Sequence, residues 1–347
     1  MKIKAAILEA LGSPLLVTSI DTAPLLPGQV LVKILFSGVC RSQLMEVKGK
    51  RGIDSWLPHL LGHEGSGIVQ EISEGVTKIK PGDEVILGWV KGDGLEAPGA
   101  KYTFGDKIIN SGRVTTFSNY SIVSESRLVK KPTPLPFDLA VLFGCALPTG
   151  AGMVLNELKP SVNLSTIILG LGGIGLSALM ALKALNVKMI IAIDISDEKL
   201  VLAKKLGATH IFNSMSPNVK QDIQKLTDGG ADRCIESAGQ VATIELGFSL
   251  IRKNGGKVIF ASHPPDGEMI KIAPHELITG KSIEGSWGGA SIPDRDIPII
   301  YNLFQKADTP LGALLTKRYK LEQINDAIDD LETGRVFRPL IVMEHLE

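Results

Sequence analysis

The sequence has no excess of charge of either sign. Lysine and arginine together number 37, as do aspartate and glutamate, so the formal net charge is zero. A protein that holds a phosphate backbone needs a basic surface that displaces the condensed counterions. Nucleic acid is therefore not an expected partner.

The chain also has little cysteine. Its three cysteines, Cys40, Cys145 and Cys234, lie far apart among 347 residues. Disulfide frameworks are typical of short secreted chains with many cysteines, so these three are better interpreted as reduced thiols or metal ligands. Reduced thiols, and a first segment without a secretory signal pattern, predict a cytoplasmic protein.

No apolar run is long enough to predict a membrane span. The stretch 167–182, which carries no charge, is shorter than the roughly 20 residues that a bilayer requires. Glycines interrupt its first half, so a buried strand followed by a buried helix is the expected structure.

What the chain does have is two regions with different patterns, and its length is enough for about two domains. Residues 1–148 contain short apolar runs, such as 30–35 and 84–87, separated by turn signals such as Pro27-Gly28. This pattern predicts a β-rich domain. The last apolar run, 338–343, is expected to form a strand that rejoins it.

Residues 149–289 alternate β-branched runs with segments of helical length, which predicts βαβ units and a parallel sheet. Ser196 stands where a helix N-cap is expected, and Gly207 stands at the end of that helix. The fold class is thus α/β plus β. Strands are expected at 166–169, 189–193, 210–212, 233–235 and 257–261.

A glycine motif follows the first strand of the α/β region. Gly170-Leu171-Gly172-Gly173-Ile174-Gly175 opens a predicted helix over 176–185, so G-x-G-x-x-G occurs in its proper context. Glycine permits a tight turn and lets a cofactor pyrophosphate reach the backbone N–H groups of the helix. The alternative is that these glycines serve packing in a domain that has lost its ligand.

Asp194 ends the next predicted strand, 19 residues after Gly175. An acidic side chain there can accept hydrogen bonds from the adenosine ribose and disfavours a 2′-phosphate. The sequence therefore predicts NAD as the cofactor and not NADP.

Catalytic zinc takes three protein ligands, often thiolate and imidazole, and keeps a fourth position open. The chain offers Cys40, His63 and Cys145. Spacing alone leaves a zinc site and two inert thiols equally open. Cys234 is expected to be an inert thiol in a buried strand, and His59 a solvated loop histidine.

Four segments carry a family resemblance, and with the glycine motif and Asp194 they span nearly the whole chain. They resemble the zinc-dependent alcohol dehydrogenases of the medium-chain dehydrogenase/reductase superfamily. The segments are Gly38-Val39-Cys40-Arg41-Ser42, the run 62–67 (GHEGSG), the run 75–85 (GVTKIKPGDEV) and the run 144–150 (GCALPTG).

The resemblance implies a GroES-like catalytic domain, 1–148 with 290–347, and a Rossmann NAD-binding domain, 149–289. It implies hydride transfer between an alcohol and NAD, in which zinc acidifies the alcohol. A homo-oligomer, either dimer or tetramer, is expected, with a small-molecule substrate and no membrane partner.

The resemblance also assigns residues. It makes Cys40, His63 and Cys145 the zinc ligands, Glu64 an acidic neighbour of the metal, and Ser42 the hydroxyl that takes the alcohol proton. The implied cofactor contacts are Arg41 and Arg338 at the pyrophosphate, Thr149 at the nicotinamide and Lys199 at the adenosine ribose, besides Gly170, Gly172, Gly173, Ile174, Gly175 and Asp194.

The chain departs from the family pattern at three places. Residues 91–119 contain no cysteine, whereas many relatives hold a second, structural zinc there, so one zinc is expected. Gln43 replaces an aspartate that orients the ligand histidine; an amide there could accept a hydrogen bond but carries no charge. Met45 replaces a histidine that ends a proton relay in some relatives.

Two alternatives remain at this point. One is a zinc-free reductase of the same superfamily that acts on quinones or enones, which would have no use for the cysteine and histidine ligands. The other is a non-catalytic NAD-binding sensor, which would bind NAD without zinc.

Overall fold

The computed structural model describes residues 1–345, and the chain divides into two compact units. Unit 1 consists of Met1–Cys145, Ile292–Pro298 and Leu311–Glu347, and unit 2 of Ala146–Ser291 and Ile299–Pro310. The predicted boundaries, 148/149 and 289/290, lie close to the observed ones. The grouping of 299–310 with unit 2 was not foreseen.

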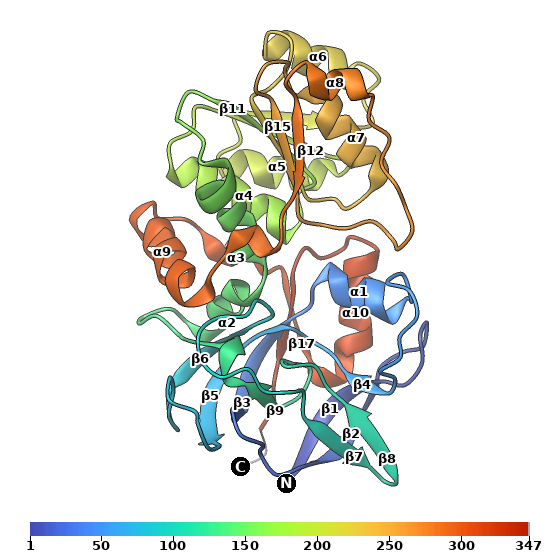
Figure 1. The fold of residues 1–347 in the computed structure, drawn as a ribbon, viewed down its shortest axis with the longest axis vertical. Helices are drawn as coiled ribbons and strands as arrows, with labels where there is room; N and C mark the ends of the chain where they lie inside the picture. Colours follow the sequence, from blue (N-terminus) through green and yellow to red (C-terminus); the bar gives the residue numbers. More distant parts are fainter. Residues whose placement is uncertain (346–347) are drawn as a thin grey trace. The chain divides into compact units, whose positions relative to one another are not determined.

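Unit 1 contains a closed barrel and a larger sheet (Figure 1). The barrel order is β1 (Lys2–Leu8), β2 (Leu16–Thr22), β7 (Lys101–Phe104), β8 (Lys107–Asn110) and β4 (His59–Leu60). The sheet order is β10 (Leu128–Lys130), β6 (Glu84–Gly88), β5 (Glu64–Ile72), β3 (Gln29–Gly38), β18 (Pro339–Val342) and β17 (Lys317–Lys320), and β9 (Tyr120–Ser124) also pairs with β3.

The β-rich prediction for the first part of the chain is confirmed. The expected runs 30–35 and 84–87 lie in β3 and β6. The C-terminal run forms β18, which pairs antiparallel with β3 at Leu340 and Gly38. The helical segments of unit 1 are α1 (Arg41–Val47), η1 (Glu125–Arg127), α2 (Phe137–Ala140), η2 (Val141–Gly144), η5 (Leu311–Leu314), η6 (Leu321–Gln323) and α10 (Ile324–Glu332).

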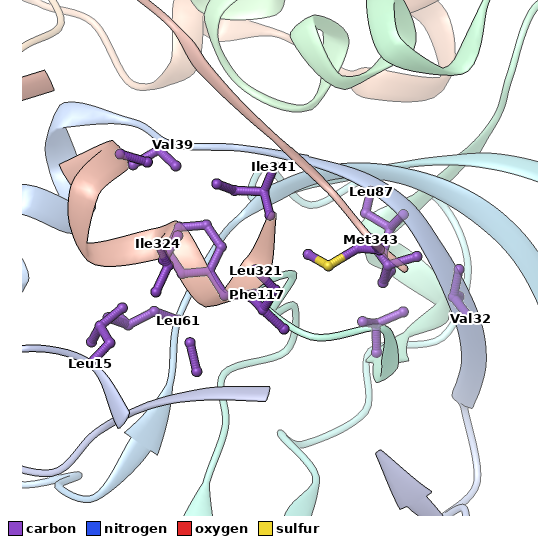
Figure 2. Packing of buried hydrophobic residues seen from close by; sticks show 14 of the residues in the cluster. Leu15, Val32, Val39, Leu61, Leu87, Phe117, Leu321, Ile324, Ile341 and Met343 are labelled. Carbon is purple, nitrogen blue, oxygen red and sulfur yellow. The ribbon is translucent and has the colours of Figure 1, made fainter. Parts of the chain in front are cut away.

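An apolar core joins distant parts of unit 1, and Figure 2 shows a part of it. Val32 of β3 and Leu87 of β6 belong to the same cluster as Ile324 of α10 and Ile341 of β18. Burial of such side chains contributes about 1.5–3 kcal/mol each. The core therefore fixes β3, β5 and β6, and two residues of the candidate site lie next to the ends of β3 and β5.

Unit 2 is a parallel sheet flanked by helices, in the order that places the first strand at the centre. This is the strand order of a dinucleotide-binding fold. The order is β13 (His210–Asn213), β12 (Met189–Asp194), β11 (Ser165–Leu169), β14 (Arg233–Glu236), β15 (Lys257–Phe260) and β16 (Ser282–Gly285). The five predicted strands are all present; the predicted range 257–261 is one residue longer than β15, and the other four predicted ranges are each one residue shorter than the observed strands.

The helical segments of unit 2 follow the strands. They are α3 (Ala146–Gly152), η3 (Met153–Leu158), α4 (Gly173–Ala184), α5 (Asp197–Lys205), α6 (Val219–Leu226), α7 (Val241–Leu250), α8 (Pro274–Ile278) and η4 (Gly288–Ala290), and α9 (Pro293–Lys306) has residues in both units. The predicted cap of α5 is confirmed, because the Ser196 side chain accepts from the backbone N–H of Lys199. The helix expected over 176–185 begins earlier, at Gly173.

Among residues 1–345, no single helix is both long and apolar enough to cross a bilayer. A bent pair, Phe137–Gly144 with Ala146–Leu158, meets the criteria of length and composition together.

Candidate metal centre and cofactor loop

The structure brings Cys40, His63 and Cys145 together within unit 1. Their potential ligand atoms all lie within 4.8 Å of one another, and Nε2 of His63 lies 3.3 Å from Sγ of Cys145. Zinc bound to sulfur at about 2.3 Å and to nitrogen at about 2.0 Å in a tetrahedron sets such atoms roughly 3.5 Å apart. The donor set and its spacing therefore fit a zinc ion.

Two strand ends and the helical turn η2 position the three side chains. Cys40 caps the start of α1 just after β3, His63 directly precedes β5, and Cys145 follows η2. Two glycines let η2 approach the sheet. A Cβ on Gly144 would lie 2.3 Å from the carbonyl oxygen of Leu87, and one on Gly88 would lie 3.0 Å from the carbonyl oxygen of Gly144.

The two thiols stabilise one negative charge between them. A hydrogen bond from Cys145 holds the pKa of Cys40 well below its usual value, and the charge of Arg338 acts in the same direction. The same hydrogen bond, together with burial, raises the pKa of Cys145. Thiolate is the form of cysteine that binds metals, so Cys40 is prepared for a cation.

Two side chains contact the other ring nitrogen of His63. Nε2 of Gln43 is hydrogen-bonded to Nδ1, and Oγ of Ser42 lies 3.5 Å from the same atom. The oxygen of the Gln43 amide is already used, because it accepts from the backbone N–H of Cys40 over 2.9 Å. The expectation that this amide could accept from the histidine is therefore wrong for this arrangement.

Glu64 and Arg338 form a buried ion pair beside the three ligands. The Glu64 side chain is fully buried, and Oε2 accepts from the Arg338 guanidinium. Burial raises the pKa of Glu64, although the charge of Arg338 opposes this. Gly38 makes room for the carboxylate, because a Cβ there would lie 2.3 Å from Oε1. The predicted contact of Arg338 with a pyrophosphate stays a prediction.

In unit 2, the glycine motif forms the loop between β11 and α4. Gly170 has a φ of +90°, and a Cβ there would lie 2.6 Å from the backbone nitrogen of Ala238. A Cβ on Gly175 would lie 2.0 Å from the carbonyl oxygen of Gly170. At Gly172, by contrast, a Cβ would meet nothing within 4 Å. This open space lies at the N-terminus of α4, where backbone N–H groups bind phosphates.

Asp194 fixes this loop to the neighbouring strand. It ends β12, and Oδ2 accepts from the backbone N–H of Leu171 over 2.7 Å. Oδ1 accepts from the backbone N–H of Ser196 over 3.0 Å. Each carboxylate oxygen can accept more than one hydrogen bond, so ribose hydroxyls still have acceptors.

The remaining predicted cofactor residues are distributed over both units. Arg41 is exposed at the start of α1 in unit 1. Thr149 is buried in α3, and Lys199 lies in α5, both in unit 2. Their contacts with a cofactor stay predictions.

One histidine was misjudged from the sequence. His59 is not a solvated loop residue; it is buried in β4, where Nε2 lies 2.8 Å from Oδ2 of Asp54. With Glu46, these residues form a second group of potential ligands. The alternation of Pro58-His59-Leu60 could have indicated a strand. Cys234 is buried in β14 as expected, and burial raises its pKa, so it is an inert thiol.

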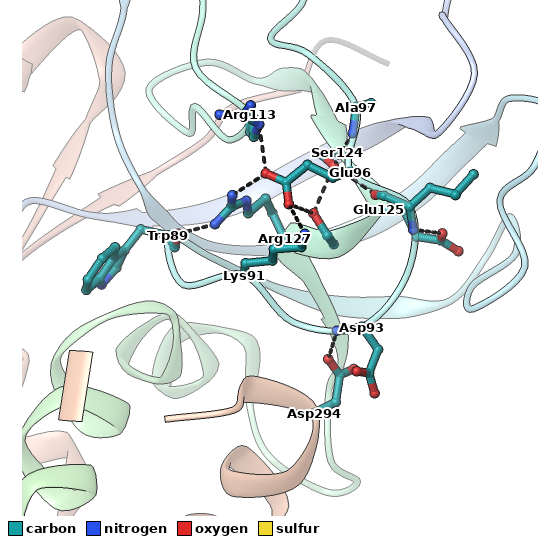
Figure 3. Close-up of polar contacts among 12 residues, drawn as sticks. Trp89, Lys91, Asp93, Glu96, Ala97, Arg113, Ser124, Glu125, Arg127 and Asp294 are labelled. Atoms are coloured by element: carbon teal, nitrogen blue, oxygen red, sulfur yellow. Dashed lines mark hydrogen bonds and ion pairs between the residues drawn. The ribbon is translucent and has the colours of Figure 1, made fainter. Parts of the chain in front are cut away.

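The segment that follows β6 is organised by two glutamates that sequence reasoning missed (Figure 3). Glu125 is fully buried and accepts from the backbone N–H groups of Thr77, Lys78 and Leu95. Glu96 binds three cationic side chains, those of Lys91, Arg113 and Arg127. The only sequence signal was acidic residues within a segment that is rich in glycine and lacks cysteine.

Comparison with known proteins agrees with this arrangement. Residues 26–133 match the model of the alcohol dehydrogenase GroES-like domain, and residues 173–305 match that of the zinc-binding dehydrogenases. The chain is 29% identical to an S-(hydroxymethyl)glutathione dehydrogenase of Paracoccus denitrificans over 375 residues, which covers 99% of this chain and 100% of that protein. The chain belongs to the zinc-dependent alcohol dehydrogenases of the medium-chain dehydrogenase/reductase superfamily.

Solved structures place the fold in the same family. A benzyl alcohol dehydrogenase from Acinetobacter calcoaceticus superposes with a TM-score of 0.90 at 29% identity, over 99% of this chain and 100% of that one. A zinc-binding-domain alcohol dehydrogenase from Burkholderia ambifaria superposes with a TM-score of 0.91 at 28% identity, with the same coverage. This chain is accordingly an oxidoreductase, and its family implies zinc and NAD as cofactors.

Proposed function

We propose that this zinc-dependent alcohol dehydrogenase oxidises a primary, secondary or sugar-type alcohol with NAD and catalyses the reverse reduction. A single zinc ion per chain is held by Cys40, His63 and Cys145. The observation that carries the proposal is the gathering of these three side chains within 4.8 Å. A zinc-free quinone or enone reductase would have no use for this ligand set.

Two observations support one zinc and not two. The segment 91–119 has no cysteine to bind a structural zinc. Carboxylates take over its organisation, because Glu96 and Glu125 bond to cationic side chains and backbone N–H groups there.

The side chains around the ligands would handle the alcohol proton. Zinc bound there acts as a Lewis acid that lowers the pKa of the alcohol. Ser42 would accept the hydroxyl proton at Oγ, which lies 3.5 Å from Nδ1 of His63, while it passes its own hydroxyl proton towards the cofactor ribose. Glu64, paired with Arg338, supplies a buried negative charge next to His63 without forming a ligand of its own in this arrangement. Because position 45 is a methionine and not a histidine, the relay would end at the ribose or at water.

The glycine loop and the end of β12 would hold NAD, which accepts the hydride. The loop 170–175 offers open space at Gly172 for the pyrophosphate. Asp194 would accept from the adenosine ribose and exclude a 2′-phosphate. Arg41, Arg338, Thr149 and Lys199 complete the proposed contacts with the cofactor. We also assign the catalytic domain to 1–148 with 290–347 and the NAD domain to 149–289.

The substrate is a small molecule, as it is for the relatives named benzyl alcohol and S-(hydroxymethyl)glutathione dehydrogenase. We place the enzyme in the cytoplasm because its thiols are reduced. We expect a homo-oligomer, either dimer or tetramer, from the family resemblance. The mass of the native enzyme in solution tests this last point.

Metal analysis combined with an activity screen tests the function. We expect one zinc per chain when zinc is supplied in excess, and NADH formation with at least one member of a panel of primary alcohols, secondary alcohols, sugar alcohols and thiol-adduct alcohols. A protein that binds NAD but contains no zinc would support the non-catalytic sensor. A protein without zinc that reduces quinones would support the reductase.

Substitution of Asp194 tests the choice of cofactor. Because the carboxylate repels a 2′-phosphate, Asp194→Ala should reduce the preference for NAD over NADP, measured as the ratio of the two kcat/KM values. An undiminished preference would contradict the assigned ribose contact.

A further inference from the structure

Gln43 is buried between two groups that both determine how its amide is oriented. On one side, the backbone N–H of Cys40 donates to Oε1 over 2.9 Å. On the other side, Nε2 is hydrogen-bonded to Nδ1 of His63. A backbone N–H can only donate, so the amide oxygen must face Cys40 and the amide NH₂ group must face His63.

This orientation selects one tautomer of His63. Because the NH₂ group donates, Nδ1 must accept, and a neutral imidazole then carries its proton on Nε2. Nε2 is the nitrogen that lies 3.3 Å from Sγ of Cys145, inside the group of three ligands. A zinc ion bound at Nε2 needs the lone pair of that atom, which puts the ring proton on Nδ1. The tautomer that Gln43 favours is thus the opposite of the one that binds the metal.

Reorientation of the amide does not remove the conflict. If the amide turned over, its oxygen would accept from Nδ1–H, but its NH₂ group would then oppose the backbone N–H of Cys40. Oγ of Ser42 lies 3.5 Å from Nδ1, at the limit of a hydrogen bond. Because the two donors contact different ends of the amide, the oxygen of this side chain, which is 1% exposed, can face only one of them. Histidines that bind metals usually donate to a carboxylate or a carbonyl instead.

We propose that Gln43 makes the zinc of this enzyme exchangeable. As a positioning residue that acts through His63, it opposes the metal-binding tautomer, so the site holds zinc more weakly than it would with a carboxylate at position 43. The proposal rests on the proposed function, because the same three ligands hold the ion. Zinc occupancy would then limit the fraction of active chains when zinc is scarce.

Gln43→Glu tests the proposal with a side chain of nearly the same size. The two carboxylate oxygens can accept from both the Cys40 N–H and Nδ1–H of His63. Holoenzyme is equilibrated with increasing concentrations of a chelator of known zinc affinity, and the absorbance of the zinc–chelator complex gives the zinc Kd. We expect the variant to bind zinc about 10- to 100-fold more tightly than wild type. An unchanged or weaker affinity would overturn the proposal.

Gln70→Glu is the matched control, since it adds the same charge to an exposed position of β5. Its zinc affinity should equal that of wild type. Equal tightening in both variants would assign the effect to net charge and would also overturn the proposal.

A measurement on the wild-type chain covers the case in which Gln43→Glu does not fold. Nitrogen NMR of histidine-labelled protein after chelator treatment should find the His63 ring proton on Nε2; a proton on Nδ1 would contradict the proposal. The proposed function fails separately, if wild type takes up no zinc even when zinc is supplied in excess. One zinc per chain without tightening in Gln43→Glu refutes only the inference about Gln43.

Discussion

Two groups of polar side chains in unit 1 differ in the partners that their arrangement suits. Cys40, His63 and Cys145 point at one another, and each pairing places two potential ligands where a cation would satisfy both. Around Glu125, by contrast, both carboxylate oxygens accept from backbone N–H groups at 2.7–2.8 Å. The first group offers three ligand atoms to a cation, whereas the acceptors of the second are occupied by the backbone donors of the protein itself.

The pKa shifts of Glu125 and Glu96 show that both carboxylates are neutralised by the protein itself. Burial would raise the pKa of Glu125, but three backbone donors outweigh it, and the pKa is lowered. Burial also tends to raise the pKa of Glu96, but the hydrogen bonds and charges of Lys91 and Arg127 lower it by more. A carboxylate that is neutralised by its own protein has no need of a metal. Hydrogen bonds and ion pairs therefore hold a segment that has no cysteine.

The largest effect that tests this comparison should come from the metal ligands. Cys145→Ala removes one of three ligands, and loss of a Lewis acid worth several kcal/mol should lower turnover at least about 10³-fold. Zinc content should fall and NAD binding should persist, as measured by metal analysis and by NADH fluorescence titration. Cys234→Ala, the same substitution at a buried thiol of unit 2, should retain zinc and turnover. Unchanged turnover in Cys145→Ala would refute the metal centre.

Substitution of Glu125 should change the stability of the protein and not its metal content. Glu125→Gln keeps one acceptor oxygen and turns an NH₂ group towards a buried donor, which should cost about 2–3 kcal/mol in the free energy of unfolding. Urea denaturation measures this cost, and zinc per chain should not change. Glu71→Gln, an exposed position of β5, is the control. If Glu125→Gln lost its zinc with unchanged stability, the two groups would not be separate.

The stability difference between wild type and Glu125→Gln should depend on pH. Because the folded pKa of Glu125 is lowered, its contribution is fully present above the unfolded pKa, which is about 4.3. As the pH falls through the lowered folded pKa, the contribution is lost and the difference should shrink. Urea denaturation of both proteins from pH 6 downwards checks this; a constant difference would argue against an ionised Glu125.

The smallest effect should come from the exposed part of the Glu96 network. The Arg113 side chain is 54% exposed, so Arg113→Ala should cost less than about 0.5 kcal/mol. Arg127 is largely buried and also donates to the carbonyl oxygen of Trp89, so Arg127→Ala should cost about 1–2 kcal/mol. Thermal unfolding of the two variants compares these costs. Equal costs would show that burial does not set their ranking.

The sequence predicted what depends on local pattern. The strands of unit 2 followed from β-branched runs, and the cofactor loop from glycines placed between a strand and a helix. At Gly170 the reason is local and strict, because its φ of +90° disfavours any other residue. Asp194 was placed correctly because the end of β12 is fixed by the same periodicity.

Contacts between distant segments were not predictable in this way. His59 was assigned to solvent because nothing in its neighbourhood showed that β4 would close a barrel against β1 and β8. The acceptors and donors around Glu125 come from three separate segments of the chain. Such pairings depend on the packing of the whole unit.

By itself, the sequence determined the ligand types, the cofactor motif and the positions of the strands of unit 2, since these are set by residue chemistry and by periodicity along the chain. Only the tertiary structure decided that Cys40, His63 and Cys145 meet, and which face of the Gln43 amide meets the imidazole. The physical reason is that a hydrogen bond or a metal site depends on distance and direction in space. His63 and Cys145, which are 82 residues apart in the chain, acquire the right distance and direction only when the segments that carry them pack together.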